Sequence, residues 1–289
     1  MELTEHNRIS IAQIIIFSPS LFISIFLCIR NGFGRNAGWL LLLIFSLARL
    51  IGASLQLATI NDPTNQSLYF GSLTLQSIGL SNLIIVLLAL INRVFLSIEK
   101  TERSALFNTR NLRWAQIFVI IGVALSASGG PISASHYIST GEYEVSSLSE
   151  AGIGLTIAGF VLLVLATAVA GLKISHVESG EKRIVLAVAI CLPFLLVRVI
   201  YSAVGTYNPS SSFNMLTGSI DVYLGAAVVE EIIIVAIIEA MGLTLQKQPK
   251  GDPADSPQRS GLIGGMVHKN SRERYAMSPL NQYPDDSSV

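Results

Sequence analysis

The stretch Ile184–Gly205, IVLAVAICLPFLLVRVIYSAVG, decides the fold class of this chain. An apolar run of about 20 residues matches the thickness of the hydrocarbon core of a bilayer, so we expect a membrane-spanning helix here. Arg198 lies inside this run, at a depth where an ionisable side chain is costly. A charge in such a position is expected to have a function and a partner, which the other apolar segments can supply.

Six further segments of the same kind occur along the 289 residues. The seven predicted spans are 9–29, 37–60, 69–96, 114–135, 150–174, 184–205 and 219–244. The fourth is the weakest, because Gly129, Gly130 and Pro131 interrupt its far end. The chain is 51% hydrophobic and 13% charged, whereas about a quarter of the residues of a soluble domain are charged. The sequence therefore predicts an all-α polytopic membrane protein with seven transmembrane helices.

Lysine and arginine fall almost entirely on one side of these spans. Of the 19 basic residues, 16 lie at the ends of spans three and five, in the linkers after spans one, three and five, or beyond span seven, whereas Arg8 alone lies on the other side. Because cytoplasmic segments carry the basic excess, we expect the short N-terminus, 1–8, outside or in the lumen. The membrane domain, 9–244, then leads into a disordered cytosolic tail, 245–289. The membrane is the endoplasmic reticulum, another endomembrane or the plasma membrane.

The arginine-bearing spans suggest an internal repeat. Arg49 precedes Asn82 by 33 positions, and Arg198 precedes Glu231 by the same 33 positions. Both arginine helices are expected to run from inside to outside, which would make a parallel 3+1+3 duplication of the kind that some small transporters use. The alternative is that apolar helices resemble one another by composition alone.

The second and seventh spans carry opposite charges at matched depth. Arg49 lies about 11 residues, or roughly 16 Å, below the outer end of its helix, and Glu230 and Glu231 lie at nearly the same level. Since an isolated charge in hydrocarbon is costly, we expect Arg49 to pair with one of these glutamates. Neighbouring residues point about 100° apart, so the other glutamate either turns to a second arginine or stays protonated. Glu239 is expected at the inner boundary.

Helical spacing adds candidate substrate-binding residues to this pair. Tyr201 lies three residues after Arg198 on one helix face, and Tyr223 lies seven before Glu230. Together with Asn82 of the third span, these side chains are expected to contact a substrate. The competing interpretation is structural, because polar pairs also tie helices together in membranes.

The sequence offers no expected metal or cofactor site. The four histidines have no metal-ligand spacing, and phosphate-loop, dinucleotide and zinc-protease motifs are absent. We expect no nucleic-acid partner. Asn65-Gln66-Ser67 is an acceptor sequon on the predicted outer side, which makes Asn65 a candidate glycosylation site. Small residues, among them Gly171, are expected to let helices approach closely.

Several stretches resemble an uncharacterised family of fungal seven-helix membrane proteins. They are Leu27–Arg35 (LCIRNGFGR), Gly38-Trp39, Ala48–Gly52 (ARLIG), Val197–Ser202 and Val229–Glu231, and the likeness covers about 9–244. The resemblance implies the topology and a fungal origin but no settled chemistry. In size, helix count and membrane carboxylates, the chain is also similar to the integral-membrane terpene cyclases of fungal meroterpenoid pathways. That second likeness is architectural and matches no motif.

Three function classes follow from the intramembrane charges. The first is a proton-initiated terpene cyclase acting on an isoprenoid, with Glu230 or Glu231 as the neutral acid and Arg49 holding the charge of the other carboxylate. The second is a transporter or translocator of a small molecule or lipid, favoured by the suggested repeat and by the ion pair at mid-depth. The third is a seven-helix receptor or scaffold.

Overall fold

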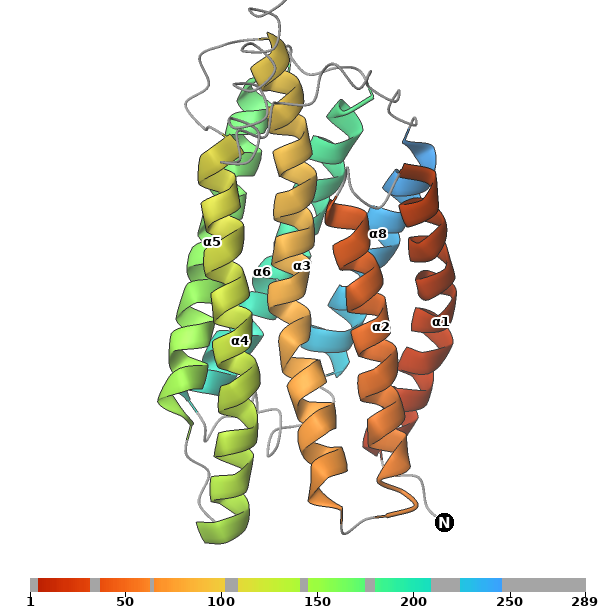
Figure 1. Ribbon diagram of the computed structural model, residues 1–289, viewed down its shortest axis with the longest axis vertical. Coiled ribbons are helices and arrows are strands. Elements are labelled where there is room, and N and C mark those ends of the chain that lie inside the picture. The colour runs from red at the N-terminus through yellow and green to blue at the C-terminus, as the bar shows by residue number, and fades with distance from the viewer. Residues whose placement is uncertain are drawn as a thin grey trace, which may run out of the picture. The chain divides into compact units, whose positions relative to one another are not determined.

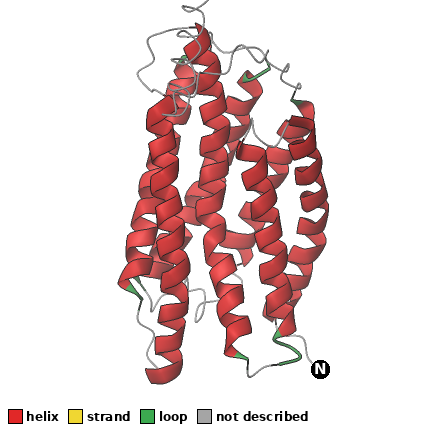
Figure 2. Cartoon of the chain, in the orientation of Figure 1, coloured by secondary structure: helices red, strands yellow, loops and turns green. Residues whose placement is uncertain are grey.

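The computed structural model describes residues 5–31, 37–62, 65–101, 109–140, 145–174, 180–208 and 224–245. These ranges are helical and contain no strand (Figure 2). The helices are α1 (Glu5–Asn31), α2 (Ala37–Ala58), α3 (Gln66–Thr101), α4 (Thr109–Thr140), α5 (Ser147–Leu172), α6 (Lys182–Tyr207), the π-helix η2 (Leu224–Val229) and α8 (Glu230–Thr244). The predicted all-α class is confirmed.

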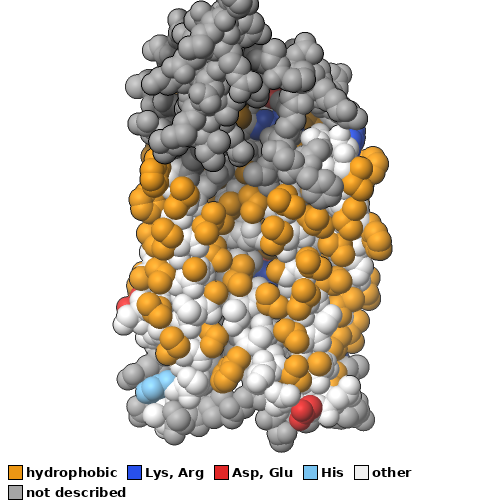
Figure 3. Space-filling model, in the orientation of Figure 1, with side chains coloured by type: hydrophobic (Ala, Val, Ile, Leu, Met, Phe, Trp, Pro, Cys, Tyr) orange, Lys and Arg blue, Asp and Glu red, His pale blue; other side chains and the backbone are white. Residues whose placement is uncertain are grey.

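Six of these helices, α1 to α6, are long and apolar enough to cross a membrane. Their outer faces carry large apolar side chains, such as Phe22, Leu172 and Leu186 with 71%, 86% and 62% of their surface exposed. Figure 3 shows hydrophobic side chains spread over the described part of one face, with a small area of Lys or Arg at mid-height. A surface of this kind suits lipid rather than water, as expected for helices that are long and apolar enough to cross a membrane. The seventh predicted span corresponds to η2 and α8, which are continuous.

Helix α3 occupies the centre of the helical unit. It packs against α2, α4, α5 and α6, and Figure 1 shows it between α2 and α4. The residues of its middle stretch, 80–88, are buried on every side, with Ile84, Val86 and Leu88 fully covered. A helix that is apolar all round is expected in such a central position. The central helix therefore presents a surface to each of the two arginine helices.

Helix α4 runs through Gly129, Gly130 and Pro131 and continues to Thr140, beyond residue 135, where the predicted span ends. Gly129 allows close packing of α4 against α5, because a side chain at this position would collide with Ser149. Membrane helices tolerate such residues when neighbouring helices compensate. The expectation that Gly171 lets helices approach closely is wrong, since no described atom lies within 4 Å of where its side chain would begin.

Helices α1 and α8 end together. Arg30 at the end of α1 donates hydrogen bonds of 2.9 Å to the carbonyl oxygens of Leu243 and Leu245 at the end of α8. A cation at a helix C-terminus is stabilising, because it meets carbonyls that lack helical partners. The two helices are therefore parallel, as the first and seventh helices of a seven-crossing protein must be.

The chain divides into a unit Met1–Lys247, which holds every helix above, and a unit Gln248–Val289. The second unit falls on the predicted disordered tail and lies outside the described residues.

Candidate functional site

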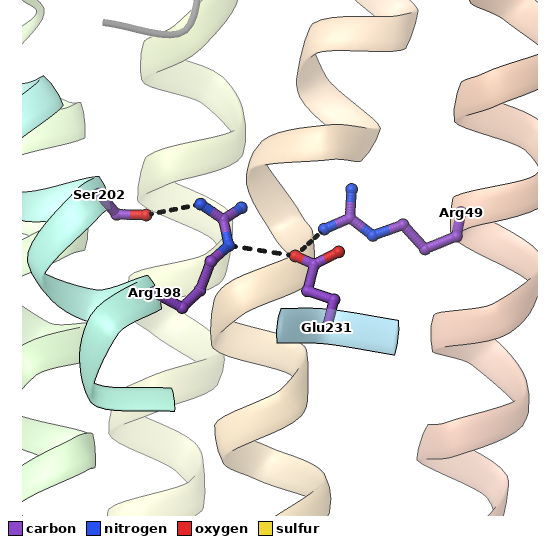
Figure 4. Close-up of polar contacts among 4 residues, drawn as sticks. All are labelled: Arg49, Arg198, Ser202 and Glu231. Atoms are coloured by element: carbon purple, nitrogen blue, oxygen red, sulfur yellow. Dashed lines mark hydrogen bonds and ion pairs between the residues drawn. The ribbon is translucent and has the colours of Figure 1, made fainter. Parts of the chain in front are cut away.

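Glu231 at the start of α8 forms ion pairs with both Arg49 and Arg198 through one carboxylate oxygen. Arg49 of α2 forms an ion pair through Nη2, and Arg198 of α6 donates from Nε to the same Oε1 at 3.2 Å. Figure 4 shows the two guanidinium groups approaching the carboxylate from opposite sides. All three residues are buried, with 3%, 4% and 1% of their surfaces exposed. The predicted pair between Arg49 and a glutamate is confirmed, and its partner is Glu231.

The surrounding helices shape a seat for each guanidinium group. Gly79 of α3 lies directly against the Arg49 guanidinium, where any side chain would overlap its Nη2. The Phe45 ring lies one helical turn from Arg49 and 5.5 Å from its Cζ. Tyr201 lies at the same distance from Arg198, whose Nη1 donates to Ser202 at 3.2 Å. Aromatic faces attract cations, so both arginines are held on one side by a ring.

The charges of this triad do not cancel. Within the triad, two arginines share one carboxylate, which leaves one excess positive charge as long as the adjacent Glu230, which interacts electrostatically with Arg198, is not ionised. Arg49 also keeps a buried Nε–H with no hydrogen-bond partner within the described ranges. Buried polar groups are normally satisfied, so an unused donor next to an excess positive charge suits an anionic ligand. We call Arg49, Arg198 and Glu231 the arginine–glutamate triad.

Glu230 lies beside the triad rather than in it. It is half-buried, and its Oε2 is buried with no hydrogen-bond partner in the part of the chain that the structure describes. Of the two arrangements considered for the adjacent glutamates, the second arginine does not take the second glutamate, because Arg198 also turns to Glu231. Helix geometry explains this choice, since residues one position apart point in different directions.

The other predicted site residues have mixed outcomes. Tyr201 contacts Arg198 as expected, whereas Asn82 is buried on α3 one turn beyond Gly79 and forms no hydrogen bond with the triad. Tyr223 lies outside the described residues. Asn65 is exposed between α2 and α3, and its Oδ1 accepts from the Ser67 amide at 3.1 Å. Its glycosylation stays a prediction.

A sequence comparison places the chain in a family. The model of a domain of unknown function, DUF7702, matches residues 3–248. The chain belongs to the DUF7702 family. The matched region includes every described helix and the whole triad, so the triad is part of the family's domain. A comparison with curated proteins finds no match. The fungal origin and the terpene-cyclase likeness remain resemblances.

Sequence reasoning missed the burial of the Glu239 carboxyl group in this DUF7702 domain. Glu239 of α8 has 7% of its surface exposed and lies 2.5 Å from Ser20 Oγ and 3.4 Å from Ser24 Oγ of α1. Ser20 in turn lies 3.1 Å from Ser46 Oγ of α2. A signal was present, because Ser20 and Ser24 lie four positions apart and so share a face of the first helix. Distance from the segment end placed Glu239 at the boundary, whereas packing buries it.

The described helices contain no group of three or more His, Cys, Asp or Glu side chains that could hold a metal ion. The polar groups that the site offers are guanidinium groups, carboxyl groups and hydroxyls. Such groups bind anions and carry protons.

Proposed function

We propose that this protein is a proton-coupled carrier for a lipid-soluble small molecule with an anionic group. An isoprenoid carboxylate or phosphate is the substrate class we favour. One observation carries the proposal: Arg49 and Arg198 both bind a single oxygen of Glu231. In this arrangement Glu231 occupies the place that a substrate anion would take between the two guanidinium groups.

The exchange of Glu231 for a substrate anion requires a proton. Once the substrate binds both arginines, the Glu231 carboxylate would be left as an unpaired charge at bilayer depth, which is costly. Taking up a proton neutralises it. The triad then carries the same net charge before and after substrate binding, because one carboxylate is replaced by one substrate anion. One proton therefore accompanies each monovalent anion.

The irregular helix before Glu231 supports the idea that this glutamate moves during transport. The π-helix η2 ends at Val229, directly before the two glutamates, and π-bulges are frequent at functional sites. Many carriers place their binding site on irregular helices near the bilayer midplane. A change between π and α geometry in Leu224–Val229 would rotate Glu231 relative to both arginines.

The wider arrangement fits the same proposal. We propose seven crossings with the N-terminus outside and the C-terminus in the cytosol, in an endomembrane or the plasma membrane. The 3+1+3 repeat is supported by the way in which Arg49 and Arg198, its equivalent positions, meet at one carboxylate. A binding site between two related halves is the arrangement expected for such carriers.

A terpene cyclase is the second candidate. Glu231 suits it poorly, because a carboxylate holding two arginines is not a neutral acid. Glu230 suits it better, since its buried Oε2 has no partner among the described residues. A neutral acid in an apolar site is what such a reaction needs.

The test uses purified protein in proteoliposomes with an entrapped pH dye. The probes are a prenyl phosphate, the corresponding prenyl carboxylate and the neutral prenyl alcohol. We expect the wild type to bind an anionic probe and to move protons with it, whereas the alcohol does neither. Arg49→Gln and Arg198→Gln should each weaken binding at least about tenfold, because breaking a buried charge contact costs about 2–5 kcal/mol.

Arg183→Gln is the matched control, because Arg183 is exposed at the start of α6. It should bind and transport like the wild type. Equal binding of the alcohol and the anions, or anion uptake without proton movement, would overturn the carrier proposal. Conversion of a prenylated acceptor to a cyclic product, lost in Glu230→Gln, would establish the cyclase instead.

A further inference from the structure

Among the described residues, the buried carboxyl group of Glu239 has no positive charge in contact with it. Among the described residues Glu239 forms no ion pair, and its contacts are the hydroxyls of Ser20 and Ser24. An ionised carboxylate without a counter-charge is costly inside a membrane protein. Hydroxyls alone compensate such a charge poorly, since each contributes only one hydrogen.

The four contacts around Glu239 need one hydrogen more than the three serine hydroxyls supply. The Ser46 hydroxyl donates to the Leu42 carbonyl at 3.1 Å, which uses its one hydrogen. The contact of 3.1 Å between Ser20 and Ser46 therefore needs the Ser20 hydrogen. Nothing is then left on Ser20 to donate to Glu239, although the two oxygens lie 2.5 Å apart. A protonated Glu239 would supply the fourth hydrogen, whereas an ionised carboxylate leaves one of the four contacts without a hydrogen.

We propose that Glu239 is a proton-binding site, in which the protonated carboxyl donates to Ser20 and the Ser24 hydroxyl completes the site. Three helices build it, since Ser20 and Ser24 come from α1, Ser46 from α2 and Glu239 from α8. This site is separate from the triad and binds a proton rather than a substrate anion. Ionisation of Glu239 would leave it without a counter-charge, so proton release requires a change in this packing.

On the neighbouring elements, Arg30, Arg49 and Arg198 are engaged elsewhere, and Lys182 and Arg183 at the start of α6 are exposed. On α1, Arg30 donates to carbonyl oxygens at the end of α8. On α2, Arg49 pairs with Glu231, which lies eight residues, or roughly 12 Å, from Glu239 along α8. Cys28 on α1 is a buried free thiol. None of these groups supplies a counter-charge through a contact with Glu239 in the described structure.

The site lies beside the triad along a line of hydroxyls. Ser46 precedes Arg49 by three residues, one turn or roughly 4.5 Å along α2. Glu239, Ser20 and Ser46 thus lead from α8 through α1 to the turn that holds Arg49. Resting on the proposed carrier function, we assign Glu239 the role of supplying the proton that Glu231 takes up.

Infrared spectroscopy of the purified protein tests the proton directly, without any substrate. We expect the wild type to show the carbonyl stretch of a protonated carboxylic acid, shifted when the protein is exchanged into heavy water. Glu239→Gln should lose this band, and Glu150→Gln, at an exposed position of α5, should keep it. Ser20→Ala should keep the band but move it to higher frequency, because the acid loses its acceptor.

If Glu239→Gln does not fold, the spectra of Ser20→Ala and of wild type whose glutamates carry an isotope label still test the site. A band that persists in folded Glu239→Gln, or that Ser20→Ala does not move, overturns the proton site. In proteoliposomes, Glu239→Gln should bind the anionic probe normally yet lower probe-driven proton movement about tenfold or more, since a buried proton donor contributes at least that much to transfer. If no probe binds but the band is present, the carrier proposal fails and the proton site stands.

Discussion

At the scale of single residues, one carboxylate neutralises two arginines, so its loss is not equivalent to the loss of either arginine. Removing Arg49 or Arg198 leaves Glu231 with one remaining partner. Removing the charge of Glu231 leaves two buried guanidinium groups facing each other without the counter-ion that they share. Breaking a buried pair in this way typically destabilises a protein by about 3–5 kcal/mol.

We therefore predict that Glu231→Gln lowers the free energy of unfolding by about 3–5 kcal/mol, and that Arg49→Gln lowers it less. Unfolding of the detergent-solubilised protein, followed by circular dichroism against temperature and denaturant, measures the order. The anionic prenyl probe should restore much of the loss in Glu231→Gln, because it replaces the missing carboxylate. Glu150→Gln is the control and should match the wild type. A probe that stabilises Glu231→Gln no more than Glu150→Gln would contradict the proposed exchange.

The residues show how far sequence alone reaches. The Arg49–Glu231 pair was predictable, because opposite charges at equal depth in hydrocarbon have to meet. That Arg198 would join the same oxygen was not predictable, since a long side chain can turn inward or outward and tertiary packing decides which. Glu239 was missed for a related reason: depth along a helix says nothing about which face the neighbouring helices cover.

At the scale of helices, glycine contacts hold α4 against α5. A side chain on Gly152 of α5 would overlap Ser126 Oγ and approach the backbone of Ser126 and Gly122. Without a hydrophobic force between helices in lipid, such close backbone approach supplies much of the association energy. The existence and extent of these helices followed from apolar length. The extension of α4 beyond residue 135 to Thr140 did not follow from it.

We predict opposite effects for two glycine substitutions on the same helix. Gly152→Ala should destabilise the protein by about 1–3 kcal/mol through overpacking against the α4 backbone. Gly171→Ala has no neighbour within 4 Å among the described atoms and should stabilise by up to about 1 kcal/mol through helix propensity. Thermal unfolding in one detergent measures both. Equal shifts would show that the α4–α5 contact does not depend on Gly152.

At the scale of the whole molecule, the basic residues and the helix ends both bear on the orientation of the protein in the membrane. Arg30 binds the end of α8, so the side reached after the first helix is also the side reached after the last. The Asn65 sequon lies beyond α2, at the opposite end of the helices. The positive-inside rule places the first side in the cytosol. The alternation of basic and neutral linkers already required α1 and α8 to be parallel. Their contact through Arg30 could not be seen in the sequence.

We predict that a tag at the C-terminus of the protein in sealed microsomes is digested by added protease, whereas a tag at the N-terminus is protected. The physical reason is that 16 of the 19 basic residues lie on the side that is predicted to be cytosolic, and moving them across the membrane is unfavourable. Asn65 offers an independent reporter, because any glycan on it must be added in the lumen. Digestion with a glycosidase should shift the mobility of the wild type but not of Asn65→Gln if the sequon is used. A protected C-terminal tag would reverse the orientation, and it would place the proton site at Glu239 towards the lumen instead of the cytosol.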